Sequence, residues 1–214
     1  MPTFSKFQNL SVKNKYIVTL LVLLVLVLDQ TLKIFVKTHY CFGENTLIGG
    51  KQWAQLNFVE NSGAAFGWQF GGDMGKLALS LFRLSAIGFM IYIGSNIRQR
   101  IPKGLLFSYA LILAGAIGNM LDSAFYGLIF SESDYHCLYG PAKFVPFAQG
   151  YAGFLHGRVV DMLYLPVTHF PDWLPGLGGS VFFSPIFNIA DSAITIGVII
   201  IFLFYTRFFN KLRE

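Results

Sequence analysis

The chain has 214 residues, of which 54% are hydrophobic and only 13% are charged. A soluble domain carries about 25% charged residues, so this composition excludes an ordinary water-soluble domain, a disordered chain and a small disulfide scaffold. The net charge of +5 leaves two anionic partners open, nucleic acid and a membrane surface, and the positions of the basic residues decide between them.

Four apolar stretches are long enough to cross the hydrocarbon core of a bilayer as helices, which takes about 20 residues. They are residues 16–36, 77–97, 104–121 and 186–204. The third is short and dense in small residues, which is typical of a helix packed closely among others. We therefore expect an α-helical integral membrane protein, a four-transmembrane-helix bundle that uses residues 1–214 as a single membrane domain.

Lysine and arginine gather before the first span, between the second and third, and after the fourth. Nine of the sixteen basic residues lie there: Lys6, Lys13, Lys15, Arg98, Arg100, Lys103, Arg207, Lys211 and Arg213. Because short cytoplasmic flanks are enriched in these residues, both termini are expected in the cytoplasm. The basic charge is thus a topology signal, and no nucleic-acid partner is needed to explain it. No small-residue cleavage site follows Leu28, so the first span is expected to stay as an anchor.

Two long segments, 38–76 and 123–185, are left for the outer side of the membrane. Residues 52–68 are rich in aromatic residues and partly alternating, which favours strands of a small extracytoplasmic β-sheet. The second segment is too long for a passive turn, and it contains a long outer insert, residues 123–156. Cys41 and Cys137 both fall outside, where disulfides persist, and the sequence leaves open whether they pair.

Acidic residues in or beside the spans are the functional signal, because a bilayer penalises them. Asp29 and Lys33 are four residues apart on one helix face, which predicts an ion pair or, alternatively, a direct role in chemistry. Asn119 and Asp122 are three apart at the end of the third span. They fit either an interhelical hydrogen bond or a ligand site.

Asp191 is the strongest of these signals. It is expected about one and a half turns inside the fourth span, with Asn188 three residues before it and no Lys or Arg within a turn. An acid at that depth is expected to face another carboxyl or a wet pocket.

Two classes of function are consistent with these acids. One is a membrane enzyme that uses a pair of carboxyl groups, and the other is a transporter or proton-conducting subunit. The two large outer segments favour the enzyme, because they suit an external substrate.

Five motifs, in order along most of the chain, resemble the lipoprotein signal peptidase (signal peptidase II) family of bacterial aspartic membrane peptidases. They are Asp29-Gln30 with Lys33, ENSGAAFGW at 60–68, GAIGNMLD at 115–122, GRVVDML at 157–163 and FNIADSAITIG at 187–197. The resemblance implies an endopeptidase that cleaves the signal peptide from diacylglyceryl-modified prolipoproteins by attack of water.

Matching positions assign the roles. The resemblance implies a catalytic pair, Asp161 and Asp191, and no cofactor or metal. Seven residues are implied or hypothesised to bind substrate or support the site: Asn61, Asn119, Asp122, Asn188, Asp29, Lys33 and Arg158. The implied partners are the lipid-modified prolipoprotein and membrane lipids. The implied location is the bacterial cytoplasmic (inner) membrane, with the active site near its outer face.

The chain departs from the family pattern at two places. Ser123 stands where family members have a basic residue, and the 123–156 insert separates two motifs that are normally close. We hypothesise that Arg158 supplies the missing positive charge. Gly63, Ala64 and Ala65 are candidates for close backbone approach to the substrate peptide.

Overall fold

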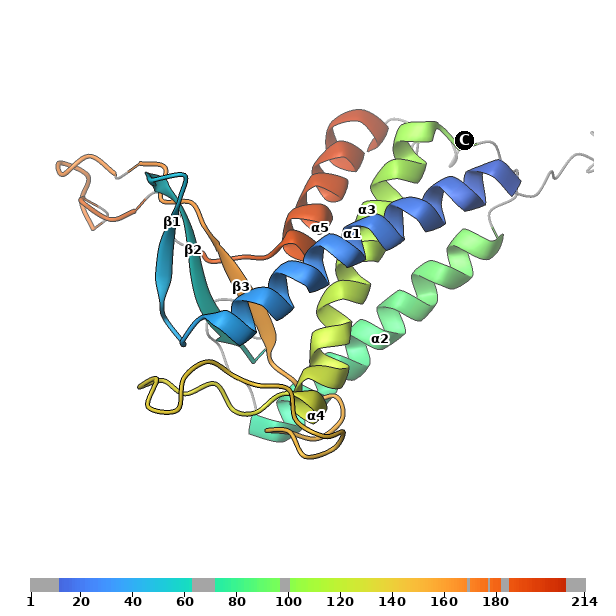
Figure 1. Ribbon diagram of the computed structural model, residues 1–214. Coiled ribbons are helices and arrows are strands. Elements are labelled where there is room, and N and C mark those ends of the chain that lie inside the picture. Colours follow the sequence, from blue (N-terminus) through green and yellow to red (C-terminus); the bar gives the residue numbers. More distant parts are fainter. Residues whose placement is uncertain are drawn as a thin grey trace, which may run out of the picture. The chain divides into compact units, whose positions relative to one another are not determined.

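The computed structural model describes residues 12–62, 72–96, 101–168, 170–176, 178–181 and 185–206. This part of the chain contains apolar helices and one three-stranded sheet (Figure 1). The chain forms two compact units. The helical unit comprises Met1–Asp29, Leu81–Met120 and Ile189–Glu214, and the sheet unit comprises Gln30–Ser80 and Leu121–Asn188. The expected single domain over 1–214 stays a prediction.

Within the described residues, three helical segments are long and apolar enough to cross a membrane. They are Asn14–His39 in α1 (Val12–His39), Gly72–Ser95 in α2 (Gly72–Asn96), and Lys103–Ile129, which begins with α3 (Lys103–Leu121). The fourth predicted span is a shorter apolar helix, made of α5 (Ile189–Ile200) and the π-helical turn η3 (Ile201–Tyr205). The predicted helical membrane fold with a small sheet is therefore confirmed.

Several predicted boundaries are wrong, and polar residues explain why. The first helix continues to His39, and Lys37 within it is fully buried in an ion pair with Glu60. The second helix begins at Gly72, five residues before the predicted apolar run. A hydropathy pattern marks where a helix is apolar, and a helix continues further wherever its polar side chains find partners or water.

The third span is longer than predicted. Beyond Leu121 the chain continues through the π-helical turn η2 (Asp122–Tyr126) and α4 (Gly127–Ile129), so the first residues of the predicted outer insert are helical. The fourth helix is shorter than predicted at its start. Its chain is still extended at residues 185–188, because Phe187 forms an antiparallel bridge with Leu163.

Helices α3 and α5 lie side by side in the helical unit (Figure 1). A side chain at Gly115 would overlap the Ala190 carbonyl oxygen and lie 2.7 Å from Ile194 Cγ1. A side chain at Gly197 would lie 2.8 Å from the Ser108 carbonyl oxygen. Glycine at these two positions lets the two backbones approach, as the small residues of the third span predicted.

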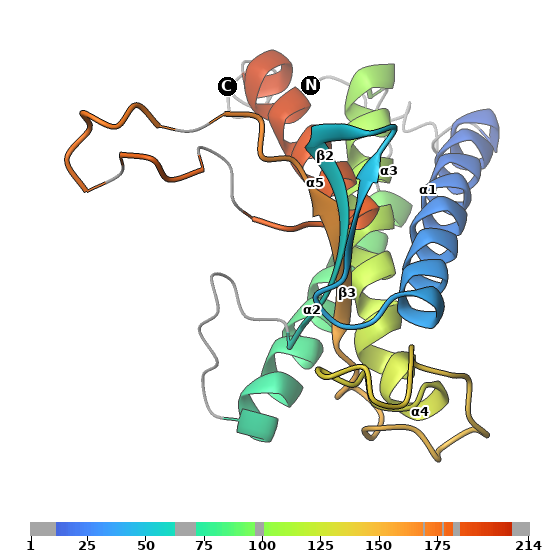
Figure 2. The ribbon, with the colours of Figure 1, turned by 60° about the vertical axis from the view of Figure 1, so that its left-hand side comes forward.

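The sheet has the order β1–β2–β3 and is antiparallel throughout (Figure 2). Strands β1 (Asn45–Ile48) and β2 (Lys51–Asn61) form a hairpin, and β3 (Val159–Tyr164) pairs along β2. Within the described residues, the predicted strand region at 52–68 corresponds to β2, and residues 63–68 lie outside the described part of the chain. Strand β3 comes from the second outer segment. Its pairing with β2 is long-range, since Asn61 pairs with Val159, which lies 98 residues further along the chain.

One apolar cluster fixes the sheet against the end of α1 and the start of the insert. Its buried members are Val36, Phe58, Tyr126, Phe130, Val160 and Met162. Fully burying side chains of this size contributes about 1.5–3 kcal/mol each. Val160 and Met162 alternate along β3, so the residues between them face the other side of the sheet.

One disulfide tethers the insert to the end of α1, and one carboxylate closes a loop within the insert. Cys137 forms a disulfide with Cys41, just beyond α1. The Asp134 carboxylate accepts hydrogen bonds from the backbone amides of His136 at 2.9 Å, Leu138 at 2.5 Å and Tyr139 at 3.3 Å. These bonds, that of His136 foremost, hold the pKa of Asp134 below its usual range.

Gly115→Ala is expected to lower the free energy of unfolding by about 1–3 kcal/mol, because the new Cβ overpacks the contact of α3 with α5. Denaturant titration in detergent micelles measures the change. The matched control is Gly88→Ala in α2, where a Cβ meets nothing within 4 Å and alanine is expected to stabilise the helix slightly. Equal effects of the two substitutions would contradict the close packing.

The Asp134 loop is expected to lose its order in acid. A lowered pKa in the folded state stabilises the loop above the unfolded pKa of about 3.9, and this contribution disappears as the pH falls through the folded value. Amide hydrogen exchange at residues 136–139, corrected for intrinsic rates, measures it. Asp134→Asn should remove the pH dependence. Protection in the wild type that persists in strong acid would be incompatible with this role of the carboxylate.

Candidate active site

Asp161 lies in the middle of β3 on the face of the sheet away from the apolar cluster. Its neighbours Val160 and Met162 point into that cluster, and alternation along the strand directs Asp161 the other way. Asp161 is only 5% exposed. A carboxyl group in the middle of a buried strand needs polar partners, because burial of an unsatisfied charge is costly.

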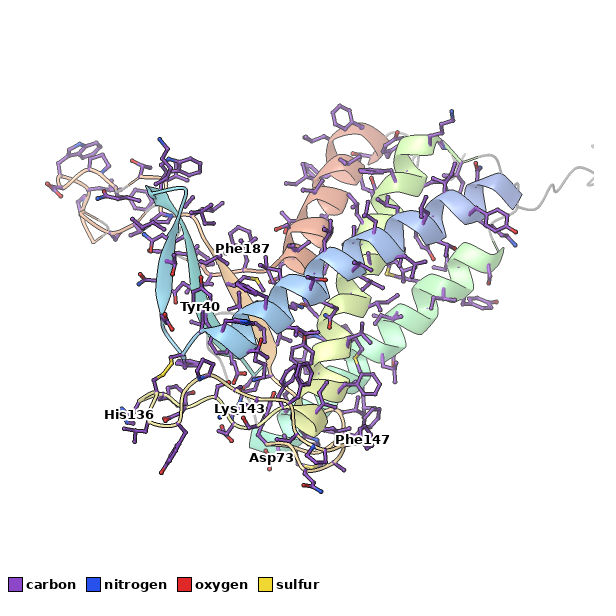
Figure 3. The ribbon with its side chains drawn as sticks, in the orientation of Figure 1. Tyr40, Asp73, His136, Lys143, Phe147 and Phe187 are labelled. Carbon is purple, nitrogen blue, oxygen red and sulfur yellow. A yellow bond between two sulfur atoms is a disulfide. The ribbon has the colours of Figure 1, made fainter. Side chains whose placement is uncertain are left out.

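Asn188 supplies one of these partners. Its Nδ2 donates to Asp161 Oδ1 at 2.7 Å and to the Val160 carbonyl oxygen at 3.2 Å, and the side chain is fully buried. The extended segment before α5 holds Asn188 in place, because Phe187 and Leu163 exchange backbone hydrogen bonds of 2.7 and 3.0 Å. Figure 3 shows Phe187 beside the strand.

Asn61 lies at the end of β2, opposite Val159 in the register. Asp161 is opposite Val59, so Asn61 is its diagonal neighbour on the same face, a geometry in which Cβ atoms are about 7–8 Å apart. The sheet therefore brings Asn61 and Asp161 to one surface. The predicted backbone-approach residues Gly63, Ala64 and Ala65 lie outside the described residues.

Both carboxylate oxygens of Asp122 are bound by groups from α1 and β3. Its Oδ2 lies 2.8 Å from Lys33 Nζ and accepts a hydrogen bond of 3.2 Å from the Val160 backbone amide, while Oδ1 accepts one of 2.9 Å from Gln30 Nε2. Asp122 and Lys33 are both fully buried. The carboxylate therefore holds β3 at the residue before Asp161. Lys33 pairs with Asp122 here, and the expected pair with Asp29 stays a prediction.

Asp191 belongs to the helical unit and lies in the first turn of α5, not one and a half turns inside the fourth span as predicted. The difference follows from the extended segment at 185–188, which delays the helix. Asn119 Nδ2 donates to Asp191 Oδ1 at 2.7 Å. The N-terminal turn of a helix favours a carboxylate, because its backbone amides point toward it.

Asp29 completes this helix start. Its Oδ1 accepts a hydrogen bond of 2.9 Å from the backbone amide of Ala190, one of the amides that the helix itself cannot satisfy. Asp29 is fully buried, and a Cβ at Gly118 would lie only 2.8 Å from its Oδ2. Gly118, within the third motif, thus leaves room for a carboxylate that caps α5.

A second group of buried charges, which the sequence analysis did not identify, surrounds Glu60. This carboxylate forms a short ion pair with Lys37, accepts a 3.0 Å hydrogen bond from Ser133 Oγ, and lies 3.2 Å from Arg158 Nη1. Arg158 also contacts Glu132 at 2.7 Å. The network joins α1, β2, β3 and the insert. A signal was present in the sequence, since Lys37 follows Lys33 by one helical turn and Glu60 precedes Asn61.

Burial and neighbouring charges shift the pKa values of Arg158 and Tyr151 in this network. Burial by itself lowers the pKa of Arg158, but the hydrogen bond from Arg158 to Glu132 and the charges of Glu60 and Glu132 outweigh it and raise the pKa. Burial, with the charge of Glu60, raises the pKa of Tyr151, whose hydroxyl oxygen accepts a 2.6 Å hydrogen bond from the Arg158 amide. Arg158 is therefore a permanently charged link between two carboxylates.

The predicted site residues divide between the two units. The sheet unit holds Lys33, Asn61, Asp122, Arg158, Asp161 and Asn188, and the helical unit holds Asp29, Asn119 and Asp191. Within the described residues, no group of three or more His, Cys, Asp or Glu side chains is arranged to hold a metal ion. Each unit thus presents one aspartate that accepts a 2.7 Å hydrogen bond from an asparagine amide.

Comparison with known proteins identifies the family. Residues 21–207 match the family described as signal peptidase (SPase) II. The chain belongs to the signal peptidase II family. The prediction from the five motifs is confirmed, and with it the enzyme class, an aspartic peptidase. The transporter alternative is not favoured.

Curated relatives agree with the family match. A protein of Porphyromonas gingivalis named lipoprotein signal peptidase is 45% identical over 204 residues, which cover 92% of this chain and 86% of the relative. One of Amoebophilus asiaticus with the same name is 36% identical over 189 residues, covering 85% and 74%. The match to the signal peptidase II family thus extends over most of the chain.

Solved structures support the fold. A bacterial membrane enzyme solved by the in meso method at 1.9 Å resolution has a TM-score of 0.60, with 22% identity, over 94% of this chain and 99% of that one. A second bacterial membrane enzyme, solved in the same way at 2.3 Å, has a TM-score of 0.57. Together with the apolar helices, this likeness makes the chain a membrane protein.

The ion pair of Lys33 with Asp122 can be tested by breaking it from either side. Lys33→Met and Asp122→Leu are each expected to lower the free energy of unfolding by about 3–5 kcal/mol, because each leaves a buried charge uncompensated. The double variant should lose clearly less than the sum. Strictly additive losses in denaturant titrations would show that the two side chains do not depend on each other.

Proposed function

We propose that the chain cleaves the signal peptide from diacylglyceryl-modified prolipoproteins, with Asp161 and Asp191 as the catalytic pair. Support for the reaction comes from the signal peptidase II family and from relatives named lipoprotein signal peptidase. The observation that carries the choice of residues is that each aspartate is held by an asparagine amide, Asp161 by Asn188 and Asp191 by Asn119.

The chain itself links the two carboxyl groups. Asn188, which donates to Asp161, precedes Asp191 by only three residues. Three residues of chain span at most about 11 Å, so the backbone of Asp191 stays within that distance of the backbone of the residue that binds Asp161. This covalent limit supports a shared site. The Asp122 carboxylate is instead bound by Lys33, Gln30 and the Val160 amide, which supports a structural role for it.

In this proposal the two carboxyls share one proton, because like charges close together are not both ionised. The ionised carboxylate removes a proton from a water molecule as the water oxygen attacks the scissile carbonyl carbon. The protonated carboxyl polarises the carbonyl oxygen and donates the proton that the leaving amine needs when the C–N bond breaks.

The asparagines are positioning residues in this scheme. A neutral amide that donates to a carboxylate fixes its rotamer without placing a further charge beside the pair. Asp122, with Lys33, holds the backbone beside Asp161, and Asp29 holds the start of the helix that carries Asp191.

Arg158 and Asn61 complete the proposed support. Arg158 lies three residues before Asp161 and bridges Glu60 of β2 and Glu132 of the insert. It therefore helps to hold β2 and β3 together beside Asp161. Its contribution is therefore to strand placement, together with the positive charge expected from the sequence. In this proposal Asn61 donates to the backbone of the substrate, and its position on the same face of the sheet as Asp161 supports that role.

We further propose that the protein lies in the bacterial inner membrane with both termini in the cytoplasm and the site near the outer face. The distribution of basic residues supports this orientation, and the two long segments then lie where lipidated precursors emerge. The lipid-modified prolipoprotein would enter from the bilayer, because its diacylglyceryl chains and signal helix are both apolar.

The catalytic pair is tested by processing of a lipidated prolipoprotein with the purified full chain in detergent micelles. Asp161→Asn and Asp191→Asn should each reduce turnover by about 10²-fold or more, because an amide neither accepts nor donates the proton that the reaction moves. Asp73→Asn, an exposed acid in the first turn of α2, is the control and should cleave normally. Either dyad variant with wild-type turnover would refute the pair.

A further inference from the structure

The end of the third span is covered by the second half of the insert. Backbone amides of Val145, Ala148, Tyr151 and Ala152 donate to the carbonyl oxygens of residues 129, 128, 130 and 127, at 2.9–3.1 Å. The last carbonyls of a helix normally need water or a cap. Here protein amides satisfy them, so this helix end has no need of water.

Two glycines make this close wrapping possible. A Cβ at Gly150 would overlap the Gly127 carbonyl oxygen and lie 2.8 Å from that of Phe130, and a Cβ at Gly127 would lie 2.8 Å from Ala152 Cβ. The insert backbone therefore lies directly on the helix end, as close as glycine at these two positions allows.

Four phenylalanines around this helix end are exposed: Phe125 at 41%, Phe144 at 61%, Phe147 at 70% and Phe154 at 55%. We call them the aromatic collar. Three of them make ring contacts: Phe125 and Phe154 form an edge-to-face pair at 6.0 Å, and Phe144 packs on the buried Phe130 at 4.5 Å. Figure 3 shows Phe147 beside α4. Residues 144–154 contain no charged side chain.

The other half of the insert, residues 131–143, differs in chemistry. It contains Glu132, Asp134, His136 and Lys143, and Figure 3 shows His136 well away from Phe147. Tyr139 in this half is 85% exposed, but its loop is closed by the Asp134 carboxylate and carries charge nearby. Both halves of the insert therefore have exposed aromatic side chains. They differ in charge, because residues 131–143 contain charged side chains and residues 144–154 contain none.

We propose that the aromatic collar lies in the interfacial layer of the bilayer and binds membrane lipid. The helical segment Lys103–Ile129 has 27 residues. At 1.5 Å each it measures about 40 Å, longer than the hydrocarbon core of about 30 Å and close to the thickness of a bilayer with its headgroups. Its end at Ile129 is therefore at headgroup level, where aromatic side chains are enriched in membrane proteins. The occupant is lipid, because residues 144–154 present exposed aromatic side chains and no charge at this level.

This contact has a consequence that rests on the proposed function. The collar ends at Phe154, and β3 begins at Val159, with the amide of Gly157 bonded to the Ser123 carbonyl oxygen at 2.9 Å. The collar thereby fixes the depth of Asp161 relative to the lipid. A substrate whose cleavage site adjoins a membrane-held diacylglyceryl group requires a catalytic carboxyl at a constant depth.

Photo-crosslinking of the full chain in nanodiscs of phosphatidylethanolamine and phosphatidylglycerol tests the contact without using activity. p-Benzoylphenylalanine replaces Phe147 or Phe154, and Tyr139 is the matched exposed aromatic control. Mass spectrometry is expected to find phospholipid adducts at 147 and 154 in clear excess over 139. Equal adduct yields at the three positions, or crosslinks from 147 and 154 to a second protein chain, would overturn the proposal.

The depth-setting role is tested with the double variant Phe147→Ser/Phe154→Ser. Its turnover of lipidated prolipoprotein should fall about tenfold or more in nanodiscs, since two apolar anchors are lost, and stay near the wild-type value in detergent. Tyr139→Ser should be unchanged in both. Equal losses in nanodiscs and detergent would refute the depth-setting role. A wild type inactive in both media would refute the proposed function, while the crosslinks still decide the lipid contact.

Discussion

A single buried carboxylate, that of Asp122, joins the parts of the sheet unit on which the site depends. It meets Lys33 and Gln30 from α1 and the Val160 amide from β3. Two charges removed from water cost several kcal/mol each, and only good geometry with further hydrogen bonds compensates for that cost. The pair therefore tolerates little displacement. This constraint makes the position of β3 and its Asp161 a consequence of how α1 ends.

The same constraint explains the π-helical turn. A helix that ended at Leu121 would leave Asp122 at its boundary, whereas η2 keeps Asp122 inside a continuous helical segment, with the Ser123 carbonyl oxygen bonded to the Gly157 amide. π-Helical turns are frequent at functional sites because they redirect side chains within a helix. The glycine at 157, whose Cβ would overlap the Asp122 carbonyl oxygen, lets the strand leave directly beside this turn.

The sequence predicts the apolar helices well, because a run of about 20 apolar residues has few stable alternatives. Their ends were not predictable, since Lys37 and Asp122 continue helices only by virtue of partners far along the chain, Glu60 and Lys33 among them. Strand β3 was missed for a similar reason, because its pairing with β2 is a long-range contact. Spacing alone singled out Asp191, but the choice of Asp161 over Asp122 required the family motifs. The structure supplies the physical difference: Asp122 faces a cation, whereas Asn188 offers Asp161 a neutral amide.

The disulfide between Cys41 and Cys137 also limits how the chain threads the bilayer. Two cysteines can pair only on the same side of a membrane, so the chain between them crosses it an even number of times. Among the described residues between them, two segments are long and apolar enough to cross, Gly72–Ser95 and Lys103–Ile129. The bond therefore closes a covalent ring around a helical hairpin whose two ends meet at one bilayer face. This parity argument uses no charged residue, and it agrees with the orientation that the basic flanks favour.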